Sequence, residues 1–254
     1  MPFTLAHPVA TLPLWSASKQ KLDLPALMVG AAIPDVSYFV ALHPVPNVGH
    51  SLLGIVTEGI PSALLLLLLG RYLFWKPVLA LLPQPISSRI PTFCPYSFLP
   101  AKRLLVIIVS IAMGALTHIA WDSFTHHHGW AVERLSFLVA DVGIFPIYKW
   151  LQYGGGLIGF PWLLWLAAQS VKKRSPRYRP ERLLQRWQGL SWGFIAIALM
   201  LMVYYAVAVT PESSLSTLIV NAIVGSVSGL FLGLFLYSVL YWLNEIFRSQ
   251  TGYH

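Results

Sequence analysis

The sequence predicts an all-α fold, a polytopic bundle of transmembrane helices with short N-terminal helices packed at the membrane face. Composition is the first observation: 56% of the 254 residues are hydrophobic and only 10% are charged, whereas about a quarter of a soluble domain is charged. The mean hydropathy of +0.66 is the second. The third is that long apolar runs alternate with short polar or proline-rich connections. We expect about five spans, with six as the alternative.

The predicted domain organisation is one integral membrane domain over residues 1–254. The first 50 residues carry short apolar stretches with ligand-type side chains. Residues 51–150 are expected to form a hairpin of two spans and a polar loop, and residues 151–254 three further spans. The five expected spans lie at 51–70, 104–121, 151–171, 191–209 and 218–243.

The segment 25–42 decides between five and six spans. It is apolar apart from Asp35, but its length of about 18 residues is marginal for a bilayer core that requires about 20. We expect the first 50 residues to fold as short or re-entrant helices over the extracytoplasmic mouth. Six spans would follow if Lys19 and Lys21 stay inside.

The distribution of Lys and Arg predicts the orientation of the bundle. The connections 71–103 and 172–190 carry five and seven basic residues, against two in 123–150 and none in 211–217. Because cytoplasmic loops are enriched in Lys and Arg, the first pair is expected in the cytoplasm and the second pair outside. The ligand-type residues at 50, 118 and 122 would then lie near the extracytoplasmic face.

The charge distribution argues against a nucleic-acid surface, and the cysteine content excludes a cysteine-based metal site. The formal net charge is +8, but the basic residues lie in loops between apolar runs, so they indicate membrane topology and not a nucleic-acid surface. Cys94 is the only cysteine, which rules out an internal disulfide and a cysteine-based zinc site. Any metal must therefore be bound by His, Asp and Glu.

The segment 114–130 brings four histidines and one aspartate to the end of an apolar run. His118 and Asp122 are four residues apart, so they project from one helix face, and His126 continues that line if the helix persists. Such side chains can bind one divalent ion or bridge two. The other interpretation is a His–Asp hydrogen bond that caps the helix. Ionisable groups at membrane depth are seldom kept without a partner or a function, which favours the metal site.

Three residues of the first 50 are the expected partners of that pair. His50 lies at the corresponding end of the neighbouring span, and Asp35 is the one charge within an apolar segment. His7 precedes a proline at the edge of another apolar stretch. If 25–42 crossed the membrane completely, His7 would lie on the opposite side from His50 unless the helix 4–16 re-entered.

Two further features allow more than one interpretation. Glu58 lies about two turns into the first span, three residues before Pro61, and is either a general base or second-shell partner, or a structural pairing residue. The run His126-His127-His128 adds a ligand, shuttles protons or lies among the lipid headgroups. His126 is the best ligand candidate of the three.

These motifs resemble an uncharacterised bacterial family of small polytopic membrane proteins. The resemblance covers most of the first 150 residues and rests on the opening MPFTxxHP, the PD pair at 34–35, the HS pair at 50–51 and the run GALTHIAWDSFTHHHG at 114–129. It implies a location in a bacterial inner membrane.

The order His, Asp, His, HxxxD is also distantly similar to membrane-bound metal-dependent hydrolases and to zinc-dependent phospholipases C. This similarity implies phosphoester hydrolysis, with metal ligands at His7, Asp35, His50, His118 and Asp122. The phospholipases use an additional HxxxE pair for a third zinc ion, and this sequence contains none. We therefore expect a mononuclear or dinuclear site.

The predicted function is that of a membrane-bound metal-dependent hydrolase acting on a lipid or lipid-linked phosphoester. The expected cofactor is a divalent metal, zinc with manganese or iron as alternatives, and the lipid bilayer is the expected partner. Asp35 or Glu58 would transfer the proton. The alternative is a non-catalytic membrane protein, either a metal or small-solute transporter or a structural partner in a membrane complex.

Overall fold

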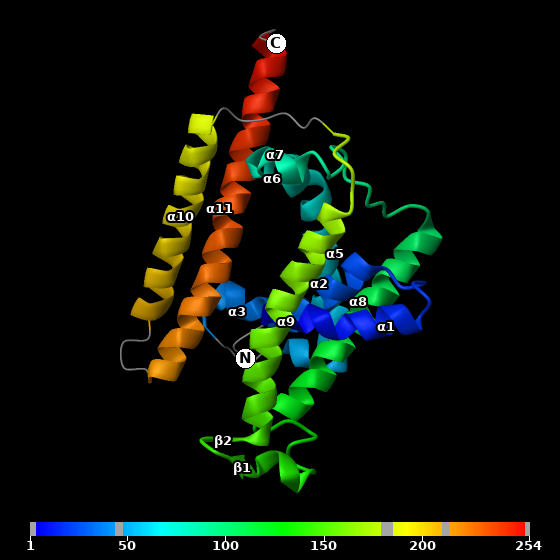
Figure 1. Ribbon diagram of the computed structural model, residues 1–254, viewed down its shortest axis with the longest axis vertical. Helices are drawn as coiled ribbons and strands as arrows, with labels where there is room; N and C mark the ends of the chain where they lie inside the picture. Colours follow the sequence, from blue (N-terminus) through cyan, green and yellow to red (C-terminus); the bar gives the residue numbers. More distant parts are fainter. Residues whose placement is uncertain (1–3, 44–47, 179–184, 210–213, 252–254) are drawn as a thin grey trace. The chain divides into compact units, whose positions relative to one another are not determined.

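The computed structural model describes residues 4–43, 48–178, 185–209 and 214–251. The start of the MPFTxxHP motif and parts of the connections counted above, at 179–184 and 210–213, lie outside these ranges. The described chain is all-α apart from a two-stranded hairpin, β1 (Asp141–Val142) with β2 (Phe145–Pro146). The predicted fold class is therefore confirmed (Figure 1).

The chain forms two compact units that interleave along the sequence. Unit 1 comprises Met1–Ser37, Pro46–Leu67 and Ser97–Ala168, and unit 2 comprises Tyr38–Val45, Leu68–Tyr96 and Gln169–His254. All the residues of the predicted metal site fall in unit 1.

The elements of the N-terminal half are short. The first are η1 (Thr4–Ala10), α1 (Thr11–Ala17), α2 (Leu24–Ala32), η2 (Ile33–Asp35), α3 (Val36–Ala41) and η3 (Val48–His50). A nearly continuous helical segment follows, made of α4 (Leu52–Gly54), the π-helix η4 (Ile55–Gly59), α5 (Ile60–Leu69), the π-helix η5 (Gly70–Phe74) and α6 (Trp75–Leu81). Then come α7 (Gln84–Ser87), α8 (Ala101–Thr125), η6 (Ser136–Val139), α9 (Ile147–Lys172), α10 (Gln185–Ala208) and α11 (Leu215–Thr251).

The helices α2 and α8 pack in direct backbone contact through two glycines. A Cβ atom on Gly30 would clash with the carbonyl oxygen of Ile111, and a Cβ atom on Gly114 would clash with that of Leu27. Only glycine permits so close an approach of two helix backbones. This contact is the centre of unit 1.

Polar contacts at the start of α2 fix its direction relative to α8. The Asp23 carboxylate caps α2 by accepting from Ala26 N at 3.0 Å, and Asp23 N donates to Ser110 Oγ at 2.8 Å. Arg103, near the start of α8, donates to Asp23 Oδ2 at 3.1 Å. Together with the glycine contacts, these bonds show that α2 and α8 run in the same direction.

The N-terminal helices fold back along α2. The chain reverses after α1 at Lys19 and Gln20, whose φ values of 53° and 61° are left-handed. At the other end of this hairpin, Thr4 Oγ1 donates to Asp35 Oδ2 at 2.6 Å. The hairpin of η1 and α1 with α2 therefore brings His7 to the same end of α2 as Asp35.

Within the described residues, five helical segments are long and apolar enough to cross a membrane, which agrees with the expected number. They are Leu24–Ala41, Leu52–Leu81, Ala101–Thr125, Gln188–Ala208 and Thr217–Gln250. The set differs from the prediction in one member: Leu24–Ala41 qualifies, whereas α9, which contains the expected span 151–171, does not. Glycines, tryptophans and Gln152 lower the hydropathy of α9, although it is a continuous helix of 26 residues.

Unit 2 is built on the antiparallel pair of α10 and α11 (Figure 1). Gly225, Gly229 and Gly233 of α11 face α10, and a Cβ atom on Gly229 would lie 2.5 Å from Leu199 Cα. Side chains of α11 also bond the backbone of the preceding helices: Trp242 Nε1 donates to the carbonyl oxygen of Leu73 at 3.0 Å.

The glycine contact between α2 and α8 leads to a stability prediction. Gly114→Val should lower the midpoint of thermal unfolding in detergent by several degrees, on the order of 5 °C, because the added side chain must separate two helix backbones. Gly193→Val is the matched control, since a Cβ atom there meets nothing within 4 Å. Equal midpoints for both variants and the wild type would contradict this packing.

Candidate metal centre

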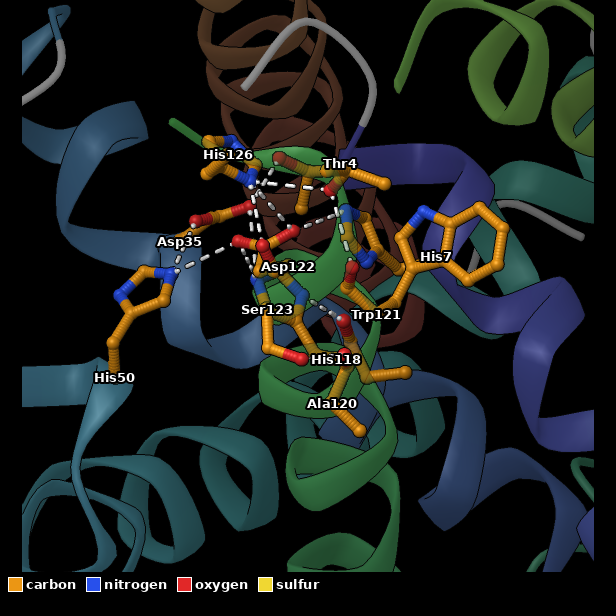
Figure 2. A network of polar contacts seen from close by, with 12 residues as sticks. Thr4, His7, Asp35, His50, His118, Ala120, Trp121, Asp122, Ser123 and His126 are labelled. Atoms are coloured by element: carbon orange, nitrogen blue, oxygen red, sulfur yellow. Dashed lines mark hydrogen bonds and ion pairs between the residues drawn. The ribbon is translucent and has the colours of Figure 1, made fainter. Parts of the chain in front are cut away.

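Five ligand-type side chains from four elements meet in unit 1 (Figure 2). We call them the His–Asp cluster: His7 of η1, Asp35 of η2, His50 of η3, and His118 and Asp122 of α8. The structure thus brings together all five residues that the resemblance implied as ligands.

The α8 pair has the geometry expected from its spacing. His118 and Asp122 are one turn apart on the same face, with His118 Nε2 3.3 Å from Asp122 Oδ2. The His118 side chain is fully buried, and that of Asp122 is 13% exposed. The helix ends at Thr125 and His126 has an extended backbone, so His126 does not continue the helical face.

Asp35 reaches the cluster because Pro34 interrupts the helix. The tripeptide Ile33–Asp35 forms a 3-10 turn between α2 and α3, as expected where proline removes a backbone donor. Asp35 is completely buried, and its Oδ2 accepts the bond from Thr4 Oγ1. A buried carboxylate with a single hydrogen-bond donor requires further compensation.

His118 has a defined tautomer. Its Nδ1 lies 2.7 Å from the carbonyl oxygen of Ala31, and a carbonyl oxygen can only accept, so Nδ1 carries a proton. In the neutral ring, Nε2 then carries a lone pair. This lone pair faces Asp35 Oδ2 at 3.6 Å and Asp122 Oδ2 at 3.3 Å, an arrangement that is favourable only when a proton or a metal ion lies between these atoms.

The spacing of the donor atoms is that of a metal shell more than of hydrogen bonds. Charge-assisted N–H···O bonds measure about 2.7–2.9 Å, whereas two ligand atoms held about 2.1 Å from a tetrahedral ion are about 3.4 Å apart. His50 Nε2 lies 3.3 Å from Asp35 Oδ1 and 3.6 Å from Asp122 Oδ2. Four buried atoms here have no hydrogen-bond partner: His7 Nδ1, Asp35 Oδ1, His118 Nε2 and Asp122 Oδ1.

Two overlapping groups within the cluster have the geometry to bind an ion. One consists of His7, Asp35 and His118, and the other of His50, His118 and Asp122; within each, the ligand atoms lie within 4.8 Å of one another. Because one imidazole nitrogen binds one ion, the groups compete for His118. Imidazole and carboxylate donors suit Zn²⁺, and also Mn²⁺ and Fe²⁺.

His7 and His50, the two histidines of the cluster that lie outside α8, carry different charges at neutral pH. Burial lowers the pKa of His7 to about 4, and neighbouring His118, whose ring stacks on it at 3.9 Å, acts in the same direction. Burial alone would also lower the pKa of His50, but its contacts with Asp122 and Asp35 raise that pKa to about 9. His7 is therefore neutral, whereas His50 carries a proton that a metal ion would displace.

His126 lies beside the cluster and belongs to neither of its two groups. Its Nδ1 is 3.4 Å from Asp122 Oδ1, and its Nε2 is 3.0 Å from Gln152 Nε2. Lys149 Nζ donates to Gln152 Oε1 at 2.9 Å, so the amide presents its NH₂ group to His126. His126 thus accepts at Nε2, and burial lowers its pKa. Its role as a ligand stays a prediction.

Glu58 is not brought to the cluster. It lies in the π-helix η4 and its side chain is exposed, and among the described residues no hydrogen bond or ion pair joins it to the cluster. The structure therefore does not support the proton-transfer role predicted for Glu58. His127 and His128 are also exposed, and His128 lies 3.8 Å from Glu133.

Three partners of the cluster were missed by sequence reasoning: Thr4, the Ala31 carbonyl oxygen and Gln152. The threonine of the MPFT motif was a weak signal, since it stands three residues before His7. Neither the backbone carbonyl nor Gln152 has a signal in the sequence, because both act through tertiary contacts.

Comparisons with known proteins yield a family and no named relative. No curated protein and no solved structure matches the chain. The model of one family, described as "Domain of unknown function (DUF4184)", matches residues 1–239. This range contains the whole His–Asp cluster and nearly all of both units. The chain therefore belongs to the DUF4184 family.

Proposed function

We propose that this protein is a membrane-bound metalloenzyme whose His–Asp cluster binds one or two divalent cations and hydrolyses a lipid or lipid-linked phosphoester. The observation that carries the proposal is the setting of His118: its Nε2 faces two carboxylates, and its Nδ1 is committed to the Ala31 carbonyl oxygen. Localisation in a bacterial inner membrane, with the cluster near the extracytoplasmic face, is part of the proposal.

The convergence of two buried carboxylates favours a bound cation at this point. Asp35 and Asp122 both lie within 3.6 Å of His118 Nε2 and of His50 Nε2. Burying unpaired charge in a low-dielectric region is costly. Protons on His50 and His118 would neutralise the carboxylates, but would leave the long separations and the unsatisfied atoms unexplained.

Zinc is the metal that we favour. Three histidines and two aspartates give a mixed nitrogen and oxygen set without sulfur, and His118 has the second-shell carbonyl partner that zinc-bound histidines generally have. Manganese or iron would accept the same donors. Thr4 supports Asp35 in the same way, because its hydroxyl holds one carboxylate oxygen and leaves the other facing His50.

The residues divide into buried ligands and groups that reach a cavity. A divalent cation, when bound, lowers the pKa of a water ligand and polarises a phosphoryl oxygen. Asp35 is completely buried, which suits a ligand, whereas Asp122 also lines a cavity together with His7 and His126. We assign proton transfer to Asp122, with His126 beside it at 3.4 Å, in place of Asp35 and Glu58, the two residues that the sequence predicted for this role.

Metal content of the purified protein is the direct test of the cation. We expect one or two divalent ions per chain in the wild type, and a loss of most of this metal in His118→Ala and in Asp122→Ala. His127→Ala is the matched control, because His127 is exposed and outside both groups. Elemental analysis that finds no divalent metal, or equal metal in all four proteins, would overturn the site.

The support given by Thr4 can be tested separately. Thr4→Val keeps the shape of the side chain but removes the donor to Asp35, so metal affinity should fall about 10-fold or more, as for other second-shell changes. Thr117→Val is the control, since that hydroxyl bonds only the local carbonyl of Gly114. Competition with a fluorescent chelator measures both. Equal affinities would contradict the supporting role of Thr4.

Catalysis needs an assay of its own. Wild-type protein in detergent should cleave a synthetic phosphodiester, lose this activity with a chelator and regain it with zinc, while His118→Ala stays inactive and His127→Ala behaves like the wild type. Metal-dependent flux into liposomes without any phosphodiester cleavage would instead support a transporter.

A further inference from the structure

An apolar cavity adjoins the His–Asp cluster within unit 1. Its volume is about 520 Å³, which falls in the range of about 300–1,000 Å³ for small-molecule sites. Residues of η1, α1, the end of α8 and the first half of α9 form its walls, and three tryptophans are among them: Trp121, Trp150 and Trp162.

The polar atoms in the wall belong mainly to the cluster and its neighbours. His7 and Asp122 face the cavity, as do His126 and the Gln152 that bonds it. Most of the remaining wall consists of hydrocarbon side chains, aromatic rings and glycines; Val9, Pro13 and Ile158 are examples. A ligand that fits must therefore combine a polar group at the cluster with an apolar body.

Glycines of α9 create the space. Gly155 lies against the indole of Trp121, where a Cβ atom would be 2.9 Å from Cζ2, and Gly159 lies against Ala6. Gly154 also lines the cavity, but a Cβ atom on it would meet nothing within 4 Å. The helix thus presents a side-chain-free groove with one open position, Gly154.

We infer that this cavity holds the hydrocarbon chain of a phosphate-headed lipid and places its phosphoester at the His–Asp cluster. This inference rests on the proposed function, since the cluster is what would recognise the phosphate. It narrows the substrate from lipid and lipid-linked phosphoesters to those whose lipid part is a linear hydrocarbon chain.

The dimensions suit one extended chain. The cavity follows α9 from Gln152 to Trp162, ten residues, or about 15 Å at the rise of an α-helix. The polar contacts at Gln152 and His126 mark one end of this path. A groove of this length can hold one extended hydrocarbon chain.

The outer surface of α9 offers a route from the bilayer. Leu157, Ile158 and Trp162 are 67%, 65% and 53% exposed, and the last two also line the cavity. Large exposed apolar side chains on a helix of a membrane protein are expected to face lipid. A lipid could then enter sideways, with its chain remaining in apolar surroundings throughout.

Photolabelling tests the inference without requiring turnover. The probe is hexadecyl phosphate carrying a diazirine near the chain end, added to the full-length protein in detergent. We expect labelled peptides from α1 and α9, and competition by unlabelled hexadecyl phosphate but not by inorganic phosphate. The chain-binding role would be overturned if inorganic phosphate competed and unlabelled hexadecyl phosphate did not, or if labelling were confined to α10 and α11.

Gly154→Leu should reduce this labelling several-fold, because the new side chain fills the open position. Gly193→Leu is the control with equally free space around its Cβ atom, but outside the cavity. Undiminished labelling of Gly154→Leu would exclude this cavity. If that variant does not fold, the competition experiment on the wild-type protein still tests whether the cavity binds the chain. Labelling that follows this pattern in a protein without phosphodiesterase activity would retain the lipid site and reject the proposed function.

Discussion

The close contact of α2 and α8 at Gly30 and Gly114 determines where the donors of the His–Asp cluster lie. Asp35 follows Gly30 by five residues and His118 follows Gly114 by four, and the two helices run in the same direction. Their backbones are near enough for the Ala31 carbonyl oxygen to reach His118. The same contact that packs the helices thus fixes the histidine tautomer, and larger residues at either glycine would separate the donors.

The cluster brings together two carboxylates that repel one another unless protons or a metal cation compensate their charge. Two buried carboxylates and a histidine lone pair converge, and several of their atoms lack a hydrogen bond. Such an arrangement is destabilising for the folded chain by itself, and functional sites commonly carry costs of this kind. The surrounding packing compensates: Thr4 holds Asp35, and the hairpin of η1, α1 and α2 keeps His7 stacked on His118.

Hydropathy and helical periodicity were sufficient to predict the all-α class, the number of candidate spans and the pairing of His118 with Asp122. Long-range partners were harder: His7, Asp35 and His50 stood out as polar residues in or beside apolar segments, and their joint role as ligands came from the resemblance, because the turns that unite them depend on tertiary contacts. The same limit applies to two other residues that the sequence singled out. His126 leaves the α8 face because the helix ends one residue earlier. Glu58 lies on an exposed π-helix face, which hydropathy does not reveal.

X-ray absorption spectroscopy at the metal edge of the purified protein tests the central claim most directly. The account predicts a first shell of nitrogen and oxygen atoms at about 2.0–2.2 Å, with the outer-shell scattering of imidazole rings, and a loss of imidazole scattering in His118→Ala. A shell of oxygen atoms alone, unchanged by that substitution, would mean that the ion is bound elsewhere and would contradict the assignment of the His–Asp cluster as a metal centre.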